Sequence, residues 1–267
     1  MTTLLTGAHG FVGSRIRAHM PVVDAPSLRH ASLEDVQRLI DQVQPDVIIH
    51  TAAISDIGTC EKNPDASYHA NVLIPEYLAR AAKDAKLLMF STDQVYSGCD
   101  SPGPYPEDDV APANLYARHK LEMEKRVLDL SPDAVMLRAT WMYDMPMYGA
   151  INRGNFLVNM LKAASTGAPM SFSSSQYRGV TWVREVARLT EEAIRLPGGV
   201  YNFGSENDLS MLDTALFLRD QLKLKVKIRD SEPRHNLWMD CTKIRRQGIA
   251  FCSTTEGLAD CIAHYSL

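Results

Sequence analysis

The sequence predicts an α/β fold built on a doubly wound parallel sheet. Apolar stretches of strand length alternate with stretches of helical periodicity over the first 140 residues. The strand-length stretches are almost continuously apolar, which is typical of strands that helices cover on both faces. A glycine-rich turn follows the first of them, where such sheets pass into their first helix. Together these observations indicate a Rossmann-like architecture.

The elements follow one another regularly in the first half of the chain. Strands are expected at 2–7, 21–25, 46–53, 86–92 and 134–140. Helices are expected at 13–20, 32–43, 63–84 and 114–130. Ser32 is the expected N-cap of the second helix, because its hydroxyl can accept a hydrogen bond from a free N–H of the first turn.

The alternation loosens after residue 140. We expect a loop over 141–155, a helix over 156–166, an extended loop-like segment over 167–182 and a helix over 183–196. This change divides the chain in two. The main Rossmann domain covers 1–140 and takes back 181–205, whereas 141–180 and 206–267 form a smaller lobe over the carboxyl edge of the sheet.

Composition excludes several classes of partner. The chain has 267 residues and a net charge of −4, without an extended basic stretch, so nucleic acid and anionic membrane are not expected as partners. No apolar run approaches the roughly 18 residues that span a bilayer. Five cysteines without CxxC spacing indicate a reducing, cytoplasmic compartment and no structural zinc or other metal site. They are Cys60, Cys99, Cys241, Cys252 and Cys261.

The stretch "TGAHGFVG" places Gly7, Gly10 and Gly13 at the first strand–helix junction. The spacing is G-x-x-G-x-x-G, a variant of the dinucleotide fingerprint with Ala8 at its second glycine. Glycine lets the backbone turn sharply and approach a pyrophosphate, and the helix N-terminus adds unpaired N–H groups and partial positive charge. The sequence therefore predicts a dinucleotide site here, which makes 1–140 a dinucleotide-binding domain.

The choice between NAD and NADP stays open. Asp24 ends the second strand and is a candidate to bind the adenosine ribose. Arg29 lies close by in sequence and could instead favour a 2′-phosphate. Each of these charges could equally be solvated in a loop.

A candidate catalytic set follows the fourth strand. Thr92 lies at the carboxyl end of that strand, where parallel sheets bind ligands. Tyr116 and Lys120 are four residues apart on one helix and share a face. A neighbouring ammonium and a cationic nicotinamide would lower the pKa of the phenol. Tyr116 could then protonate a carbonyl oxygen, to which Thr92 donates a hydrogen bond.

The chain resembles the extended short-chain dehydrogenase/reductase superfamily, and within it the dTDP-4-dehydrorhamnose reductase family. The resemblance covers most of the chain and rests on several segments in family order. They are "TGAHGFVG", "QPDVIIHTAAISDIGTCEKNPDASYHANV", "STDQVYSG", "PYPEDDVAPANLYARHKLEMEK", "MLRATWMY", "GNFLVNML" and "QYRGVTWVREVA".

The resemblance implies a role for each matching residue. Tyr116 would be the proton donor and Lys120 its partner, while Thr92 and Asp93 would contact a keto-sugar and Trp141 would lie near it. Gly10, Phe11 and Val12 would lie on the pyrophosphate side of the cofactor. Ala52, Ala53 and Ile54 would lie beside the dinucleotide, and Asn71 matches an asparagine of the family. The smaller lobe would bind the substrate.

Departures from the family pattern concern the sugar, the nucleotide and the cofactor. Arg29 and His30 stand where the family carries an acid, so both are candidate cofactor contacts. Gln94 stands where dehydratases of the superfamily have a glutamate. An amide cannot act as acid or base, so dehydration is disfavoured. His119 is expected on the surface and outside the chemistry.

The leading hypothesis is an NAD(P)H-dependent reductase of a nucleotide-linked 4-keto-6-deoxysugar. An epimerase of nucleotide sugars on the same scaffold is the first alternative. A non-catalytic regulatory subunit, resembling that of methionine adenosyltransferase, is the second. The apolar helices also allow a homodimer, which the sequence does not decide.

Overall fold

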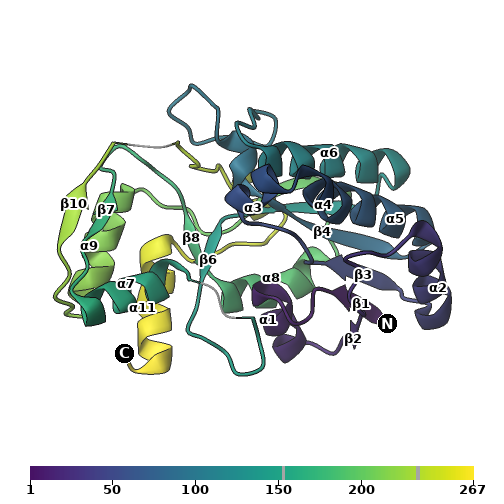
Figure 1. The fold of residues 1–267 in the computed structure, drawn as a ribbon, viewed down its shortest axis with the longest axis horizontal. Helices are drawn as coiled ribbons and strands as arrows, with labels where there is room; N and C mark the ends of the chain where they lie inside the picture. The colour runs from purple at the N-terminus through teal and green to yellow at the C-terminus, as the bar shows by residue number, and fades with distance from the viewer. Residues whose placement is uncertain (152–153, 233–234) are drawn as a thin grey trace.

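Parallel strands form the centre of the computed structural model, which describes residues 1–151, 154–232 and 235–267 (Figure 1). Within this part of the chain the main sheet has six strands in the order β2-β1-β3-β4-β5-β9, and all its neighbouring pairs are parallel. This confirms the expected Rossmann-like α/β fold. The strands are β1 (Thr3–Thr6), β2 (Val23–Asp24), β3 (Val47–His50), β4 (Lys86–Thr92), β5 (Val135–Ala139) and β9 (Gly199–Phe203).

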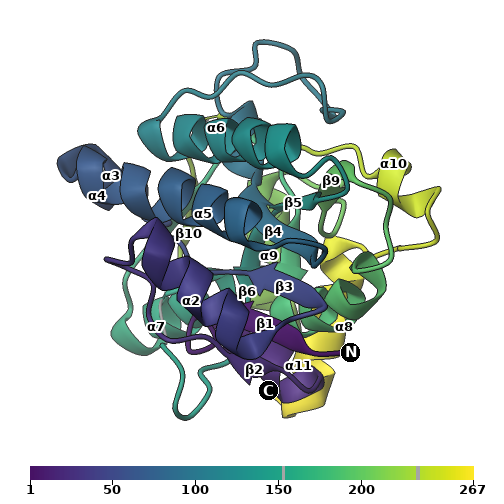
Figure 2. The same ribbon diagram turned by 90° about the vertical axis from the view of Figure 1, so that its right-hand side faces the viewer.

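Helices cover both faces of this sheet (Figure 2). Alternate residues of a strand point to opposite faces, so Leu5 and Ile49 join one core cluster and Leu4 and Ile48 the other. The first cluster packs under α1 and α8, and the second under α2, α5 and α6. The bounds are α1 (Phe11–His19), α2 (Leu33–Val43), α5 (Ile74–Ala81), α6 (Leu115–Leu130) and α8 (Val183–Ala193).

Two helix starts show how local sequence sets these boundaries. Ser32 caps α2 as expected, and its hydroxyl accepts a hydrogen bond from the backbone N–H of Asp35. The Asp35 carboxylate accepts one in return from the Ser32 N–H, which completes a capping box. Asn114 caps α6 in a similar way, with its side chain accepting from the Ala117 N–H. This cap fixes where the helix that carries Tyr116 begins.

The helix expected over 63–84 is divided. It consists of α4 (Pro64–Tyr68), the π-helical turn η1 (His69–Leu73) and α5, and a further short helix, α3 (Ile57–Lys62), precedes it. Pro75 lacks the N–H that would bond to the carbonyl four residues back, so the ladder is interrupted. The Ile74 N–H reaches the His69 carbonyl instead, which widens the turn at Asn71.

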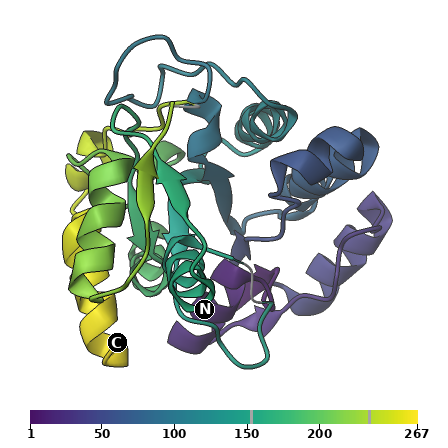
Figure 3. The ribbon, with the colours of Figure 1, turned by 60° about the vertical axis from the view of Figure 1, so that its left-hand side comes forward.

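A third core cluster lies beyond the main sheet (Figures 1 and 3). It joins Tyr143, Phe156 and Leu218, among others, and so combines segments from 141–180 and from 206–267. The division into these two lobes stays a prediction. The elements there are α7 (Phe156–Thr166), β7 (Met170–Phe172), α9 (Met211–Gln221), β10 (Ile228–Asp230) and α11 (Thr254–Tyr265). The short helix α10 (Thr242–Arg245) packs instead against β9, with Ile244 in the first cluster.

Two expectations after residue 140 are corrected. The loop expected over 141–155 begins as a strand, β6 (Trp141–Tyr143), and residues 152–153 of that stretch lie outside the described residues. The segment 167–182 contains β7 and also β8 (Val180–Trp182). β6 and β8 are distant in sequence and pair in parallel. Each is three residues long and is stabilised as a strand by the other, so neither stretch can be recognised as a strand from its own sequence.

The order of the strands places a crevice at one edge of the sheet. The chain passes from β1 to β2 on one side and then to β3 on the other, so the loops after β1 and β3 diverge. Ligands of open parallel sheets bind at such a switch point, outside the carboxyl ends of the strands. In the described part of the chain, no helix is both long and apolar enough to cross a membrane.

Candidate active site

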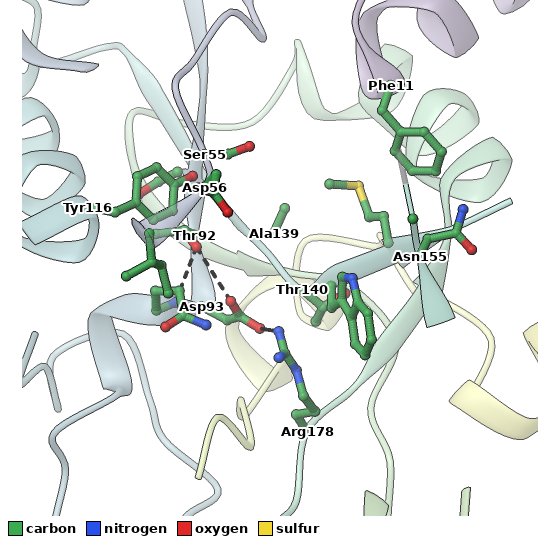
Figure 4. A pocket seen from close by; sticks show the side chains of 16 residues that line it. Phe11, Ser55, Asp56, Thr92, Asp93, Tyr116, Ala139, Thr140, Asn155 and Arg178 are labelled. Carbon is green, nitrogen blue, oxygen red and sulfur yellow. Dashed lines mark hydrogen bonds and ion pairs between the residues drawn. The ribbon is translucent and has the colours of Figure 1, made fainter. Parts of the chain in front are cut away.

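A cavity of about 460 Å³ opens at the carboxyl edge of the sheet (Figure 4). Five of the predicted site residues line it together, although they come from four separate segments of the chain. They are Phe11, Thr92, Asp93, Tyr116 and Trp141. The sequence did not single out others that also line it, namely Ser55, Asp56, Thr140, Asn155 and Arg178.

The glycine loop is built as a tight turn against β3. Gly7 has a φ of +74°, which favours glycine, and a Cβ there would lie 2.7 Å from the backbone nitrogen of Ala52. A Cβ on Gly13 would lie 2.2 Å from the carbonyl oxygen of Gly7, so this residue allows α1 to start close to the strand. These two glycines are required by the fold itself.

Gly10 has a different surrounding. A Cβ on it would meet only the Gly7 carbonyl oxygen, at 3.1 Å. It is the N-cap of α1 without a side-chain cap, and no acidic residue stands in the first turn. The N–H groups after it, beginning with those of Phe11 and Val12, therefore keep the positive end of the helix available for an anion. This arrangement fits a pyrophosphate.

The loop after β3 is held by one buried side chain. The Asn71 amide accepts a hydrogen bond from the Ile54 N–H at 3.0 Å and donates one to the Ile54 carbonyl at 2.9 Å. Ala52 and Ala53 lie in the same loop, and the backbone of Ala52 packs against Gly7 of the glycine turn. The π-helical turn thus serves to aim Asn71 at the segment expected beside the dinucleotide.

The residues expected to choose between NAD and NADP do not line the cavity. Arg29 and His30 are exposed in the turn between β2 and α2. The Asp24 carboxylate accepts a hydrogen bond from Arg17 at 3.0 Å, on the surface. These positions leave the cofactor preference open, as the sequence did.

Thr92 and Tyr116 approach each other at the wall of the cavity. Both side chains are largely buried, and both line the cavity. Burial raises the pKa of Tyr116 above its ordinary value, and the nearby Thr92 hydroxyl opposes this. The sequence analysis expected a lowered pKa for Tyr116, and the protein without its cofactor does not have one. A raised pKa keeps the phenol protonated at neutral pH, which is the state that can give a proton to a carbonyl oxygen.

Lys120 lies one helical turn beyond Tyr116 and is 1% exposed. Its ammonium donates to the Sδ of Met123 at 3.3 Å, a weak acceptor. Burial lowers the pKa of Lys120 to about 8, and the nearby Glu124 carboxylate acts in the opposite direction. Lys120 does not line the cavity itself.

Two buried polar groups, His50 and Glu124, interact electrostatically with Lys120. His50 ends β3, and its Nδ1 lies 2.7 Å from the Thr6 hydroxyl, while its Nε2 has no hydrogen-bond partner among the described residues. Burial, together with the Lys120 charge, lowers the pKa of His50 to about 3, so this ring is neutral. Glu124 is held by Arg138 through hydrogen bonds of 3.0 and 2.7 Å. These groups fix the electrostatic setting of the lysine.

Arg178 is the main residue that the sequence did not reveal. Its guanidinium donates to the Asp93 carboxylate at 2.5 Å and lies over the Trp141 ring, 5.4 Å from the ring centroid. Figure 4 shows the resulting row of side chains, Thr92, Asp93 and Arg178, along one wall. Arg178 precedes β8 in an otherwise polar segment, and it is positioned by the pairing of β8 with β6 and by a bridge to Leu237, which are contacts distant in sequence.

His119 corrects a second expectation. It is 7% exposed rather than on the surface, because α4 and η1 pack against α6. Its Nδ1 lies 2.9 Å from the Ser67 hydroxyl, which in turn accepts from Asn71 at 3.2 Å. A chain of polar contacts therefore leads from the helix of Tyr116 to Ile54.

The family model described as the RmlD substrate binding domain matches residues 1–266, almost the whole chain. The chain belongs to this family. Membership of the RmlD family confirms the resemblance that the motifs gave, and it accounts for the order in which those motifs occur.

Named relatives of this RmlD family chain agree with it. A dTDP-4-dehydrorhamnose reductase of Aggregatibacter actinomycetemcomitans is 30% identical over 82% of the chain and 78% of the relative. That of Burkholderia thailandensis is 32% identical over 73% of the chain and 66% of the relative. A solved structure of the Bacillus anthracis enzyme, in complex with NADP, covers 99% of both chains with a TM-score of 0.87. At 22% identity it supports the fold.

Proposed function

We propose that this protein is an NAD(P)H-dependent reductase of a nucleotide-linked 4-keto-6-deoxysugar. The observation that carries the proposal is that Thr92 and Tyr116 line the same cavity, with Lys120 buried one helical turn from Tyr116. The relatives named dTDP-4-dehydrorhamnose reductase supply the substrate class. Gln94, an amide at the cavity wall, supports reduction over dehydration.

The chain's own residues account for the proton. When bound, the reduced nicotinamide would supply a hydride, a hydrogen nucleus with its two electrons, to the carbonyl carbon. Thr92 donates a hydrogen bond to the carbonyl oxygen and stabilises the negative charge that develops on it. Tyr116 gives its proton to the same oxygen, and Lys120 stabilises the phenolate that remains. Asp93 and Trp141 orient the sugar.

The cofactor would bind at the glycine loop. The free N–H groups at the start of α1, next to Gly10, would bind the pyrophosphate. Ala52, Ala53 and Ile54 would border the dinucleotide, with Asn71 fixing the last of them. Lys120 would also bind the ribose of the nicotinamide. Arg29 and His30 would reach the cofactor only at its adenosine end, and NAD and NADP both remain candidates.

Turnover distinguishes this function from its alternatives. Purified protein is mixed with NADH or NADPH and a panel of nucleotide-diphospho-4-keto-6-deoxysugars, and absorbance at the nicotinamide band is followed. A reductase oxidises one dinucleotide for each sugar reduced. An epimerase converts sugar without net oxidation, and a regulatory subunit binds dinucleotide without accelerating either reaction. Either of the last two results would overturn the proposal.

The proposal also includes the compartment, the partner and the assembly of the enzyme. We place it in the cytoplasm, which the five free cysteines support because a reducing compartment keeps thiols unpaired. A small-molecule nucleotide sugar is its partner. Assembly as a homodimer is part of the same proposal and is tested by its mass in solution.

A further inference from the structure

The carboxylate of Asp144 is a meeting point for side chains from distant segments. Asp144 directly follows β6, and its side chain is 1% exposed. Its Oδ2 accepts a hydrogen bond from the Nε of Arg15 at 3.1 Å, and Arg15 is itself only 2% exposed. Its Oδ1 accepts from the indole N–H of Trp182 and from the Tyr265 hydroxyl, each at 2.9 Å. The ion pair therefore joins α1 to side chains that pack on the third core cluster.

Stability does not explain why this ion pair is buried. Taking two charges out of water costs about as much free energy as their attraction returns, and apolar side chains of similar volume often stabilise a fold better. The role of the pair is therefore sought in what it holds in place. Arg15 lies one helical turn after Phe11, the first residue of α1, where the pyrophosphate of the cofactor is proposed to bind.

The guanidinium of Arg15 holds Phe11. It lies over the Phe11 ring, 4.6 Å from the ring centroid, and one Nη donates to the Phe11 carbonyl at 3.4 Å. The other Nη donates to the carbonyl of Met145 at 2.8 Å. Because the Nε is bonded to Asp144, each nitrogen of the guanidinium has an acceptor, and its orientation is fixed. The ring of Phe11 in turn lines the candidate active site.

Asp144 holds a second residue of the same cavity through its backbone. Its carbonyl accepts a hydrogen bond at 2.9 Å from the amide of Asn155, the N-cap of α7. Asn155 and Phe11 both line the cavity, and Figure 4 shows them on the side away from Tyr116. Asp144 does not line the cavity itself. It acts on that side at second hand, by Arg15 and by its own carbonyl.

We propose that Asp144 is a positioning residue for the cofactor: through Arg15 it fixes Phe11, and with it the N–H groups that receive the pyrophosphate. The inference rests on the proposed function, which places the dinucleotide at the start of α1. Donors that are ordered before binding have less freedom to lose when the ligand arrives, so they bind it more tightly. Without the carboxylate, Arg15 loses its counter-charge and no longer keeps Phe11 in one orientation.

Dinucleotide binding tests this without turnover. The dissociation constants of NADH and NADPH are measured by calorimetry for the wild type and for Asp144→Asn. This variant keeps the shape of the side chain and the backbone contact with Asn155, but it removes the charge that holds Arg15. We expect the dinucleotide to bind about 10-fold more weakly, the cost of ordering one or two side chains on binding. The melting temperature should also fall, because a buried charge loses its partner.

Two further variants separate positioning from stability. Tyr265→Phe is the matched control, because it removes a donor to Oδ1 of the same carboxylate and leaves Arg15 on Oδ2. It should lower the melting temperature without changing dinucleotide affinity. The double variant Arg15→Met with Asp144→Asn leaves neither charge of the pair buried alone, so its melting temperature should exceed that of Asp144→Asn. Its dinucleotide affinity should stay about 10-fold below the wild type, because Phe11 is still not held.

A milder variant covers the case in which these substitutions prevent folding. Arg15→Lys keeps the charge opposite Asp144 but has no planar set of donors, so it cannot reach the carbonyls of Phe11 and Met145 together. It should weaken dinucleotide binding by a smaller factor than Asp144→Asn. Thermal unfolding of each variant shows which of them are folded and can be compared.

The outcomes separate this inference from the proposed function. Unchanged dinucleotide affinity in the folded variants of the pair, equal weakening by Tyr265→Phe, or recovered affinity in the double variant overturns the positioning role, even if keto-sugars are reduced. Weakening confined to variants of Arg15 and Asp144 supports it. The same weakening in a protein that oxidises no NAD(P)H with any keto-sugar overturns the reductase alone. A wild type that binds neither dinucleotide overturns both.

Discussion

The two sides of the candidate site are built in different ways. The cofactor side, residues 7–13 and 52–54, is backbone: a glycine turn, a helix N-terminus and a loop after a strand. The substrate side, consisting of Asp93, Trp141 and Arg178, is made of long side chains from three separate segments. A site made of backbone is determined by residues that are neighbours in the sequence. A site made of side chains depends on which distant segments the fold brings together. Breaking one side should therefore leave the other intact.

The largest effect is expected at the residue that the two sides share. Tyr116→Phe removes the proton while it keeps the ring that lines the cavity. We expect kcat to fall about 1,000-fold, within the range of general acid catalysis, with the dissociation constant of the dinucleotide unchanged. Steady-state kinetics and a cofactor titration measure the two quantities. Near-normal reduction by this variant would exclude Tyr116 as the proton donor.

On the cofactor side, Gly10→Val should prevent binding of the pyrophosphate without unfolding the protein. A Cβ at this position meets only the Gly7 carbonyl oxygen at 3.1 Å, but it stands where the phosphates must approach. We expect the dinucleotide to bind about 100-fold more weakly, as for lost hydrogen bonds to a charged group. Binding of a nucleoside diphosphate on the substrate side should persist.

Gly13→Ala is the matched comparison for that variant. Its Cβ would lie 2.2 Å from the Gly7 carbonyl oxygen, so α1 must move and the melting temperature should fall. A fold that tolerates Gly13→Ala, or unchanged dinucleotide affinity in Gly10→Val, would contradict the division of roles among the glycines.

The sequence signals for the proposed cofactor side are local. Gly7, Gly10 and Gly13 stand next to the strand and helix that need them, and Tyr116 and Lys120 share one helix. The same alternation predicted five of the six strands of the main sheet, but neither β9 nor the order of the strands. Arg178 could not be found in this way, since its partner Asp93 is distant in sequence and β6 and β8 are each too short to be recognised alone.

His119 illustrates the same limit within a helix. Periodicity places it on another face than Tyr116 and Lys120, which is correct. It does not reveal that the π-helical turn packs on that face and buries it. The irregular turn follows from Pro75, whose effect on Asn71 is clear only once the helix is seen. Sequence thus predicted the direction of the side chain but not its surroundings.

A smaller effect is expected where the two sides are joined. Ser67 links His119 on the catalytic helix to Asn71 and the cofactor loop. Ser67→Ala leaves buried donors or acceptors unpaired, which should lower the free energy of unfolding by about 1–3 kcal/mol. Chemical denaturation measures it, with Ser165→Ala on the exposed face of α7 as control. Equal stability of the two variants would show that the link is not significant.

Alkaline pH should produce the smallest change in activity. The activity and the stability of the fold are expected to change in opposite directions, which separates the two effects. The pKa of Lys120 is about 8 in the folded protein against 10.5 ordinarily. As pH rises through 8 the ammonium is lost, so kcat/KM should decline above that value. Between pH 8 and 10.5 an unfolded chain would hold more protons at this lysine, so the same group makes the fold more stable as pH rises. Titration of Lys120 would therefore lower the activity in this pH range without unfolding the protein.

The position of this decline depends on the charges around Lys120. His50 is neutral and Tyr116 stays protonated, so Glu124 is the group that raises the pKa, and Arg138 acts through its pairing with Glu124. Glu124→Gln should therefore shift the decline in kcat/KM to lower pH, whereas Glu122→Gln, at a partly exposed position of the same helix, should not. Rate profiles from pH 6 to about 10 compare the three proteins. A decline that stays in place in Glu124→Gln would assign it to a group other than this buried lysine.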